Sequence, residues 1–187
     1  SKIRNLSFQE ICAKIKLELS WTKRSRFMKV LAIDTSNQAM SIAVLDDEKV
    51  IGEITTNIKR NHSERLMPAI DELMKDVQWQ PSDLNRIVVA KGPGSYTGLR
   101  IGVTVAKTLA WTLGVELVGI SSLKTLAGNC ESSPHYLVPL FDARRKNIYT
   151  GLYQWQNGEL IQIEDDKHIS ADKWAEYLSK KEGQFIL

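Results

Sequence analysis

The order of the secondary-structure elements predicts an α/β fold for this chain. Three apolar or β-branched runs come first, and Asp46-Asp47-Glu48 is a hairpin turn between the second and the third. Helices and strands then alternate, as in the crossovers of a partly parallel sheet. The expected strands cover 29–33, 40–45, 49–55, 86–90 and 116–120, and the expected helices cover 63–75, 99–113 and 121–127. This order is typical of a ribonuclease H-like lobe, whereas a flavodoxin-like or Rossmann sheet would place a helix after its first strand.

Each element has a local signal in the sequence. The runs 29–33 and 86–90 are almost wholly apolar, as expected of central strands that are covered on both faces. Ser63 is suited to cap the first helix, and Pro68 lies early in it, where a proline costs least. Glycines precede the helix over 99–113, which carries two charged residues.

Beyond this lobe the sequence predicts the start of a second one. Two such lobes make the fold shared by actins, sugar kinases and heat-shock ATPases. Residues 28–131 form the expected first lobe, and residues 132–187 begin the second, which we expect to be truncated. Its expected elements are strands over 136–141 and 148–155, a turn at Asn157-Gly158 and a helix over 169–180 capped by Ser170. Residues 1–27 are rich in Lys and Arg, and we expect a non-native or disordered extension there, with a functional basic arm as the alternative.

The composition excludes several classes of protein. The chain has 187 residues, of which 43% are hydrophobic and 25% charged, so a disordered or low-complexity chain is excluded. Its 25 Lys and Arg residues against 22 Asp and Glu residues leave a net charge of +3, which is too small to indicate nucleic-acid binding by itself. No apolar run is long enough to cross a bilayer, and the two cysteines match no metal or disulfide spacing. A reducing, cytoplasmic compartment is therefore expected, without membrane contact.

Two segments could bind a nucleotide or another anion. Asp34-Thr35-Ser36 ends a buried strand, where its oxygens could meet a hydrated metal or a phosphate, or could satisfy the backbone amides of a turn. Gly92, Gly94 and Ser95 belong to a loop before a helix, where free N–H groups could face an anion. The loop is neither a Walker loop nor Gly-x-Gly-x-x-Gly, so close packing of the helix on the sheet is an equal alternative.

The two main helices carry more apolar surface than one sheet face needs. A helix on a sheet has to bury one apolar stripe, but the helix over 99–113 carries two. The helix over 63–75 adds methionines beside its apolar line, and methionine adapts well to partner surfaces. The residues expected at a partner interface are Leu66, Met67, Ile70, Met74, Ile101, Val105, Thr108 and Thr112. Deeper burial within the chain itself is the alternative.

The sequence contains no arrangement that indicates a catalytic or metal site. His62, His135 and His168 are isolated, and no His/Cys cluster occurs. The paired acids Asp46-Asp47 and Asp165-Asp166 are expected in solvated turns rather than as an acid/base pair. We therefore expect neither catalytic residues nor metal ligands.

Several motifs in a fixed order resemble one protein family. They are Lys29-Val-Leu-Ala-Ile-Asp-Thr-Ser36, His62-Ser-Glu-Arg-Leu-Met-Pro68, the glycine-rich block over 92–107, Gly119-Ile-Ser-Ser-Leu-Lys-Thr-Leu126, Asp142-Ala143-Arg144-Arg145 and Tyr149. Together they are similar to TsaB, the family of bacterial tRNA threonylcarbamoyladenosine biosynthesis proteins, also called glycoprotease-like. The similarity runs from Met28 to at least Leu152, and the block over 92–107 is highly specific.

The resemblance implies a partner role. The related TsaD transfers threonylcarbamoyl from an adenylate to an adenosine beside the tRNA anticodon. TsaB pairs with TsaD through helices of its first lobe, which here are 63–75 and 99–113, and the ATPase TsaE joins them. The resemblance also implies contact with tRNA through the complex. Because exposed apolar helices seldom stay exposed, a homodimer through the same surface is expected when TsaD is absent.

One departure from the relatives concerns metal. TsaD-like enzymes carry His-x-x-x-His ligands where this chain has Ser122 and Leu126, and leucine cannot bind a metal. Metal-assisted catalysis is therefore not expected at this place. The segment over 34–36 and the glycine-rich loop would then be a vestigial nucleotide site with at most weak affinity for ATP or ADP, or a purely structural element.

Two other functions are compatible with the sequence. A nucleotide-binding phosphotransferase or ATPase of the actin-like fold would hydrolyse ATP, and Asp34→Ala would abolish that activity. Direct RNA binding by Arg100, Lys107, Arg144 and Arg145 would weaken steeply as the salt concentration rises.

Overall fold

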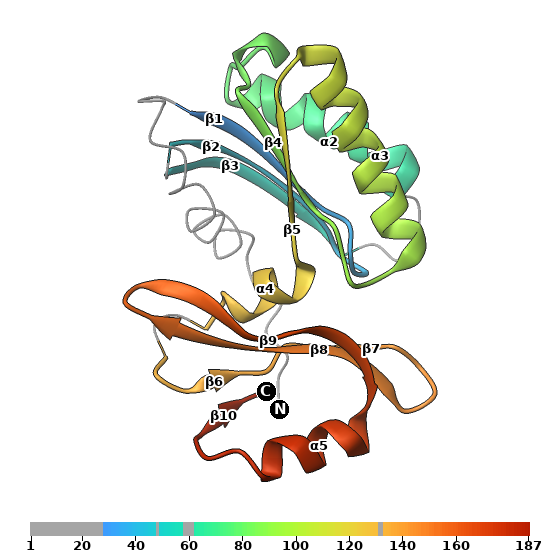
Figure 1. Ribbon diagram of the computed structural model, residues 1–187. Coiled ribbons are helices and arrows are strands. Elements are labelled where there is room, and N and C mark those ends of the chain that lie inside the picture. Colours follow the sequence, from blue (N-terminus) through green and yellow to red (C-terminus); the bar gives the residue numbers. More distant parts are fainter. Residues whose placement is uncertain (1–27, 48, 58–61, 131–132) are drawn as a thin grey trace. The chain divides into compact units, whose positions relative to one another are not determined.

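The computed structural model describes residues 28–47, 49–57, 62–130 and 133–187 (Figure 1). The chain forms two compact units, of which the first ends at Ile120 and the second runs from Ser121 to Leu187. Each unit is built around its own sheet. The extension expected over 1–27 lies outside the described residues.

A five-stranded mixed sheet lies at the centre of the first unit, in the order β3-β2-β1-β4-β5 (Figure 1). β1 (Lys29–Asp34) pairs antiparallel with β2 (Met40–Asp46), and β2 pairs antiparallel with β3 (Lys49–Thr56). On its other side, β1 pairs parallel with β4 (Arg86–Ala90), which pairs parallel with β5 (Glu116–Ile120). This topology confirms the predicted ribonuclease H-like fold class, and the five strands begin at the residues that the sequence predicts.

Two helices, α2 (His62–Asp76) and α3 (Tyr96–Leu113), cover one face of this sheet, and a short 3-10 helix, η1 (Pro81–Asp83), leads from α2 to β4 (Figure 1). α3 begins three residues before its predicted start because Ser95 caps it. The hydroxyl of Ser95 accepts a hydrogen bond from the N–H of Gly98 at 3.3 Å. Gly114 ends the helix in the left-handed conformation that glycine favours.

The main core of the first unit lies between the sheet and these helices. Successive side chains of a strand point to opposite faces, so Leu31 and Ile33 face the helices while Val30 and Ala32 face the other way. All four are buried, as expected of a central strand. The helix-side core also contains Met40, Ile42, Val44, Leu66, Ala69, Ile70, Leu73, Met74, Leu84, Ile87, Val89, Ala106 and Ala110.

The sheet of the second unit is arranged around β8 (Asn147–Gln156). This strand pairs antiparallel with β6 (Tyr136–Leu137), β7 (Leu140–Asp142) and β9 (Glu159–Ser170), and β10 (Phe185–Ile186) pairs parallel with β6. Asn157 and Gly158 form the predicted turn between β8 and β9, and both have positive φ angles.

Two helices pack on this second sheet. α4 (Ser122–Ala127) packs on β8 and β9, and the hydroxyl of Ser121 caps it. α5 (Ala171–Ser179) is capped by Ser170, as the sequence predicts, and buries Trp174 in a cluster with Val138 and Leu152. The compact units therefore divide at Ile120, whereas the predicted boundary follows residue 131, because α4 belongs with the second sheet.

The second unit differs from the prediction in three elements. The single strand predicted over 136–141 is wrong, because β6 ends at Leu137 and β7 begins at Leu140, with Pro139, which has no N–H to donate, between them. The helix predicted over 169–180 is too long at both ends, because Ile169 belongs to β9 and the helix ends at Ser179. β9 itself was not predicted, because charged residues hide its strand character.

Candidate functional site

The segment after β1, Asp34-Thr35-Ser36, is enclosed by protein. Thr35 and Ser36 are buried, and Asp34 Oδ1 accepts the backbone N–H of Ser36 at 2.8 Å. Asp34 keeps part of its surface exposed, but protein atoms surround its carboxyl. This desolvation raises the pKa of Asp34, against the hydrogen bonds from Ser36, which lower it. Burial therefore favours the protonated form of this acid.

The glycine-rich loop lies directly against this segment. The N–H of Ser95 donates to the carbonyl oxygen of Ser36 at 2.6 Å. A Cβ on Gly94 would lie 2.3 Å from the same oxygen, which is closer than any side chain can approach. A Cβ on Gly92, whose φ is 104°, would lie 3.1 Å from Leu99 Cδ1. The loop glycines therefore permit a close approach between two parts of the protein's own chain.

The first turns of α3 continue this contact. Thr35 Oγ1 donates to the carbonyl oxygen of Gly98 at 2.7 Å, and the bond is buried. A Cβ on Gly98 would lie 2.1 Å from the carbonyl oxygen of Thr35, and a Cβ on Gly102 would lie 2.2 Å from Thr35 Oγ1. Close packing of the helix on the sheet thus accounts for these glycines. A vestigial nucleotide or anion site at Asp34, Thr35, Ser36, Gly92, Gly94 and Ser95 stays a prediction.

Three of the residues expected at a partner interface lie in the protein's own core. Leu66 is fully buried, and the exposed fractions of Ile70 and Met74 are 6% and 5%. For Leu66 the structure therefore favours the alternative of deeper burial. Ile70 and Met74 differ from Leu66 because both also line a cavity at the surface.

The other five interface candidates lie nearer the surface. Met67 of α2 has an exposed fraction of 45%, and Thr108 and Thr112 of α3 are exposed. Ile101 and Val105 are half-buried and pack against the helix-side core. α2 and α3 thus combine core residues with a partly exposed surface. Met67, Ile70, Met74, Ile101, Val105, Thr108 and Thr112 are together called the α2–α3 face below.

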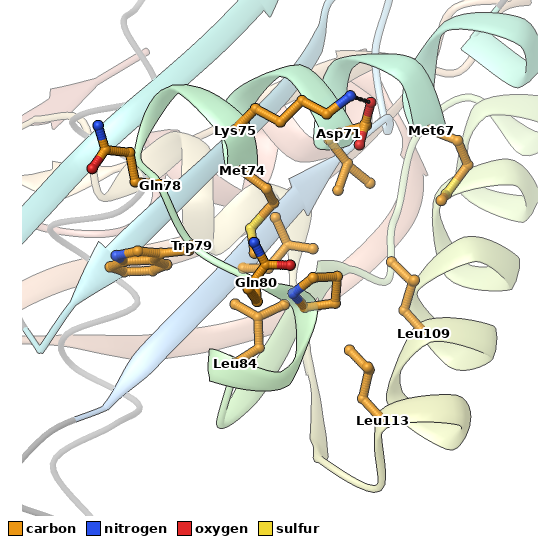
Figure 2. A pocket seen from close by; sticks show the side chains of 13 residues that line it. Met67, Asp71, Met74, Lys75, Gln78, Trp79, Gln80, Leu84, Leu109 and Leu113 are labelled. Atoms are coloured by element: carbon orange, nitrogen blue, oxygen red, sulfur yellow. Dashed lines mark hydrogen bonds and ion pairs between the residues drawn. The ribbon is translucent and has the colours of Figure 1, made fainter.

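A cavity of about 560 Å³ lies between α2, α3 and the segment that contains η1 (Figure 2). Met67, Leu109 and Leu113 project into the space between the two helices. Asp71 and Lys75, which form an ion pair at 2.6 Å, also line the cavity. The remaining lining residues are Leu31, Ile70, Met74, Gln78, Trp79, Gln80, Pro81 and Leu84. Most of these side chains are apolar, so the cavity suits an apolar group better than a charged one.

Sequence reasoning missed two exposed aromatic residues on α3. Trp111 has an exposed fraction of 90% and Tyr96 one of 74%. Trp111 lies three residues after Thr108, so helical spacing places it beside the expected interface residues. That spacing is the signal that could have found it.

Ser122 and Leu126, the residues expected at the metal-ligand positions of TsaD-like enzymes, lie on α4. Ser122 is buried, and its hydroxyl has no hydrogen-bond partner among the described residues, while Leu126 is half-buried. Within the described part of the chain, no group of three or more His, Cys, Asp or Glu residues could hold a metal ion. In the same part, no helix is long and apolar enough to cross a membrane.

A buried polar network in the second unit was also missed. The hydroxyl of the fully buried Tyr153 donates to Asp166, and the hydroxyl of Ser121 donates to the same carboxylate. Burial, with the bond to Asp166, raises the pKa of Tyr153, so the phenol stays neutral. The prediction that Asp165-Asp166 lies in a turn is wrong, because both residues belong to β9.

The sheet order of the first unit, with α2 and α3 on one face and a glycine-rich loop against the end of β1, defines a lobe of the actin-like ATPase superfamily. The model of the TsaD protein family, described as tRNA N6-adenosine threonylcarbamoyltransferase, matches residues 49–185 of this chain. The chain belongs to the TsaB family, as its relatives show.

The relatives cover most of this chain. A Bacillus subtilis protein named tRNA threonylcarbamoyladenosine biosynthesis protein TsaB is 52% identical over 155 residues, which are 83% of this chain and 68% of that protein. Its Escherichia coli namesake is 31% identical over 129 residues, which are 68% of this chain and 55% of that protein. The solved structure of YeaZ from Pseudomonas aeruginosa has a TM-score of 0.70 at 30% identity and covers 76% of this chain. This chain spans between 55% and 68% of the length of these relatives.

Proposed function

We propose that this chain is a non-catalytic partner of a TsaD-type threonylcarbamoyltransferase and supports the formation of threonylcarbamoyladenosine next to the tRNA anticodon. The observation that carries the proposal is the α2–α3 face with its cavity. Met67 is exposed there although it is apolar, and the cavity that it helps to line is formed mainly by apolar side chains. Apolar surface of this kind on a folded unit is typical of a binding site for another protein.

The chemistry of the chain supports a partner role over a catalytic one. By the resemblance, Ser122 and Leu126 correspond to the imidazole ligands of TsaD-like enzymes; leucine cannot bind a metal, and a serine hydroxyl is a poor ligand compared with imidazole. The glycine-rich loop and the start of α3 contact Ser36 and Thr35. These contacts account for the glycines without a bound nucleotide. The reaction would then take place on the TsaD-type partner.

The proposal includes the wider assembly of the family. A TsaE-type ATPase would join the pair, and tRNA would be bound by the assembly, in the cytoplasm. In the absence of the TsaD-type partner, a second copy of this chain would cover the α2–α3 face, because exposed apolar surface favours association.

The test is complex formation with the TsaD-type protein of the same organism, measured by size-exclusion chromatography with light scattering. Met67→Glu places a charge on the exposed part of the α2–α3 face, and Thr108→Glu does the same from α3. Gln156→Glu, at an exposed position of β8, is the matched control for the added charge. We expect the wild type and the control to form a complex and both face variants to lose it while circular dichroism shows them folded.

Two results would contradict the proposal. The first is a wild-type chain that forms no complex with the TsaD-type protein. The second is a pair of folded face variants that bind as tightly as the wild type, because the partner would then contact another surface. ATP hydrolysis by the purified chain that Asp34→Ala abolishes would favour the nucleotide-binding alternative instead.

A further inference from the structure

We propose that a basic hairpin tip and a neighbouring row of rings in the second unit form one binding surface for unpaired RNA. The basic tip consists of Arg144, Arg145 and Lys146, in the turn between β7 and β8 (Figure 1). The ring row consists of Phe141, Tyr149 and His168, on β7, β8 and β9. This inference rests on the proposed function, because the RNA concerned is the tRNA on which the assembly acts.

The backbone of the basic tip has an unusual conformation. Arg144, Arg145 and Lys146 have φ angles of 65°, 51° and 62°, so three consecutive residues other than glycine are left-handed. L-residues adopt this conformation rarely, and usually singly, because Cβ approaches the carbonyl oxygen. Glycine or asparagine would fit the turn with less strain. Backbone strain of this kind is concentrated at functional sites, so three cationic residues in this turn indicate a functional role.

Hydrogen bonds on both sides hold the tip in place. Asp142 Oδ1 accepts the N–H of Arg144 at 2.8 Å, and the N–H of Asn147 donates to the carbonyl oxygen of Arg144 at 2.9 Å. The N–H of Ala171, the first residue of α5, donates to the carbonyl oxygen of Lys146 at 3.0 Å. The tip is therefore anchored to both strands of its hairpin and to a helix.

The cationic side chains of the tip are open to solvent. All three residues are exposed, and none of their side chains forms a hydrogen bond or an ion pair with another described residue. Three cations on one short turn concentrate positive charge on a chain whose net charge is only +3, and such a cluster can bind phosphates.

The ring row lies beside the tip on the same sheet. Phe141 pairs with Tyr149, and Tyr149 pairs with His168, so the three side chains project from one face of the sheet. The rings of Tyr149 and His168 are 5.2 Å apart, and His168 is exposed. Ile148, next to Tyr149 in the chain, packs toward Trp174 of α5, so the ring row lies on the face opposite α5.

Cations beside half-exposed rings are the chemistry of single-stranded nucleic-acid recognition. The cations bind the phosphates, and the rings stack on unpaired bases. A duplex would offer phosphates but no free base face, and an acidic protein surface would use the cations without the rings. The two parts of the surface therefore favour an unpaired RNA segment, such as a tRNA loop, over either of these partners.

The experiment measures binding of a fluorescently labelled, unmodified tRNA transcript by fluorescence anisotropy over a range of salt concentrations. The chain is used alone and together with the TsaD-type protein. In the tip variant, Arg144→Ala, Arg145→Ala and Lys146→Ala are combined. We expect its log–log salt slope to be shallower by about two, since each lost phosphate contact on a single strand contributes about 0.7. The control combines Lys49→Ala, Lys173→Ala and Lys180→Ala at exposed positions elsewhere, and it should bind nearly as the wild type does.

A second variant tests the ring row. Tyr149→Leu keeps an apolar side chain but removes the stacking surface, and we expect it to weaken tRNA binding about five-fold or more without changing the salt slope. A duplex RNA of the same length should bind more weakly than tRNA and should not respond to Tyr149→Leu.

Three results would overturn the inference. They are equal losses in the tip variant and its charge-matched control, an unchanged affinity in Tyr149→Leu, and no effect of the tip variant on either the chain alone or the pair. Complex formation with the TsaD-type protein is measured on the same samples. A pair that forms but binds tRNA independently of the tip removes this inference alone, whereas the absence of a pair removes the proposed function.

Discussion

Thr35 and Gly98 form a buried hydrogen bond that ties the segment after β1 to the first turn of α3. Thr35 Oγ1 donates to the carbonyl oxygen of Gly98 at 2.7 Å, and a Cβ on Gly98 would lie 2.1 Å from the carbonyl oxygen of Thr35. The bond requires a glycine at position 98, because a Cβ there would keep the two backbones apart. α3, which carries four of the seven residues of the α2–α3 face, is positioned by this contact.

The first prediction is that Gly98→Ala destabilises the protein. Alanine is the better helix former by about 1 kcal/mol, so an exposed helical site would gain stability from the change. Here the added Cβ would overlap the Thr35 backbone, and overpacking of this kind costs about 1–3 kcal/mol. The free energy of unfolding in urea, followed by circular dichroism, measures the balance. Thr104→Ala, at an exposed position of the same helix, is the control and should be neutral or stabilising; an equal gain for both variants would contradict the close contact.

The second prediction concerns Asp34 and pH. Burial raises the pKa of this carboxyl above its ordinary value of 3.8, so the folded state holds a proton that the unfolded state has already released. The protein therefore loses stability as the pH rises from the ordinary pKa of the carboxyl through its raised pKa in the folded state. The loss persists at neutral pH. Asp34→Asn removes the charge and keeps an oxygen that can accept the N–H of Ser36.

We therefore expect Asp34→Asn to be more stable than the wild type at neutral pH, with the difference shrinking as the pH falls through the raised pKa toward 3.8 and levelling off below it. Urea unfolding at several pH values measures this difference. Asp76→Asn, at the exposed end of α2, controls for the loss of one acidic residue. A gain for Asp34→Asn that is the same at every pH would show that charge burial is not its cause.

The sequence predicted the first unit better than the second for a physical reason. β1 and β4 are buried on both faces, so their apolar runs stand out against the polar residues around them. β9 contains Asp165, Asp166 and Lys167 in succession and is held by its pairing with β8 and by the bonds of Asp166 to Tyr153 and Ser121. Contacts between strands are not visible as a local pattern, so the charged run was interpreted as a turn.

The candidate site was predicted in part. Helical spacing placed Met67 and Thr108 on surfaces that are exposed, but it could not show that Leu66 is enclosed by the core. The glycine-rich loop was recognised, while the group that its glycines approach, the backbone at Ser36, became visible only in the fold. The left-handed conformation of Arg145 had no signal at all, because no glycine marks the turn.

The third prediction uses this turn. Arg145→Gly should stabilise the second unit by about 0.5–1 kcal/mol. Glycine relieves the left-handed strain of about 1–2 kcal/mol, but it also increases the conformational entropy of the unfolded chain, which offsets part of this stabilisation. Thermal unfolding followed by circular dichroism measures the change. Arg145→Ala removes the same charge but keeps the strain, so it should leave the stability nearly unchanged. A loss of stability on Arg145→Gly would mean that the arginine side chain supports the fold and is not held there for a ligand.

The last prediction compares two tyrosines that donate to carboxylates in the second unit. Tyr153 is fully buried and donates to Asp166, whereas Tyr177 is exposed and donates to Glu164 at 2.5 Å. Removing a hydroxyl that donates to a charged group in a buried network costs about 1.5–3 kcal/mol, while an exposed group recovers most of the loss from water. Tyr153→Phe should therefore destabilise the protein by about 1.5–3 kcal/mol, and Tyr177→Phe by less than about 1 kcal/mol.

The same chemical change at both positions makes Tyr177→Phe the control for the loss of a phenolic hydroxyl. Urea unfolding gives the two free energies, and Ser121→Ala combined with Tyr153→Phe tests whether the two donors act through the shared carboxylate. Ser121 also caps α4, with its hydroxyl accepting the N–H groups of Leu123 and Lys124 at 3.1 Å each. If the two changes simply add, the donors act independently; a non-additive result shows that Asp166 couples the start of α4 to β8, because residues that share one partner in a network do not contribute separately.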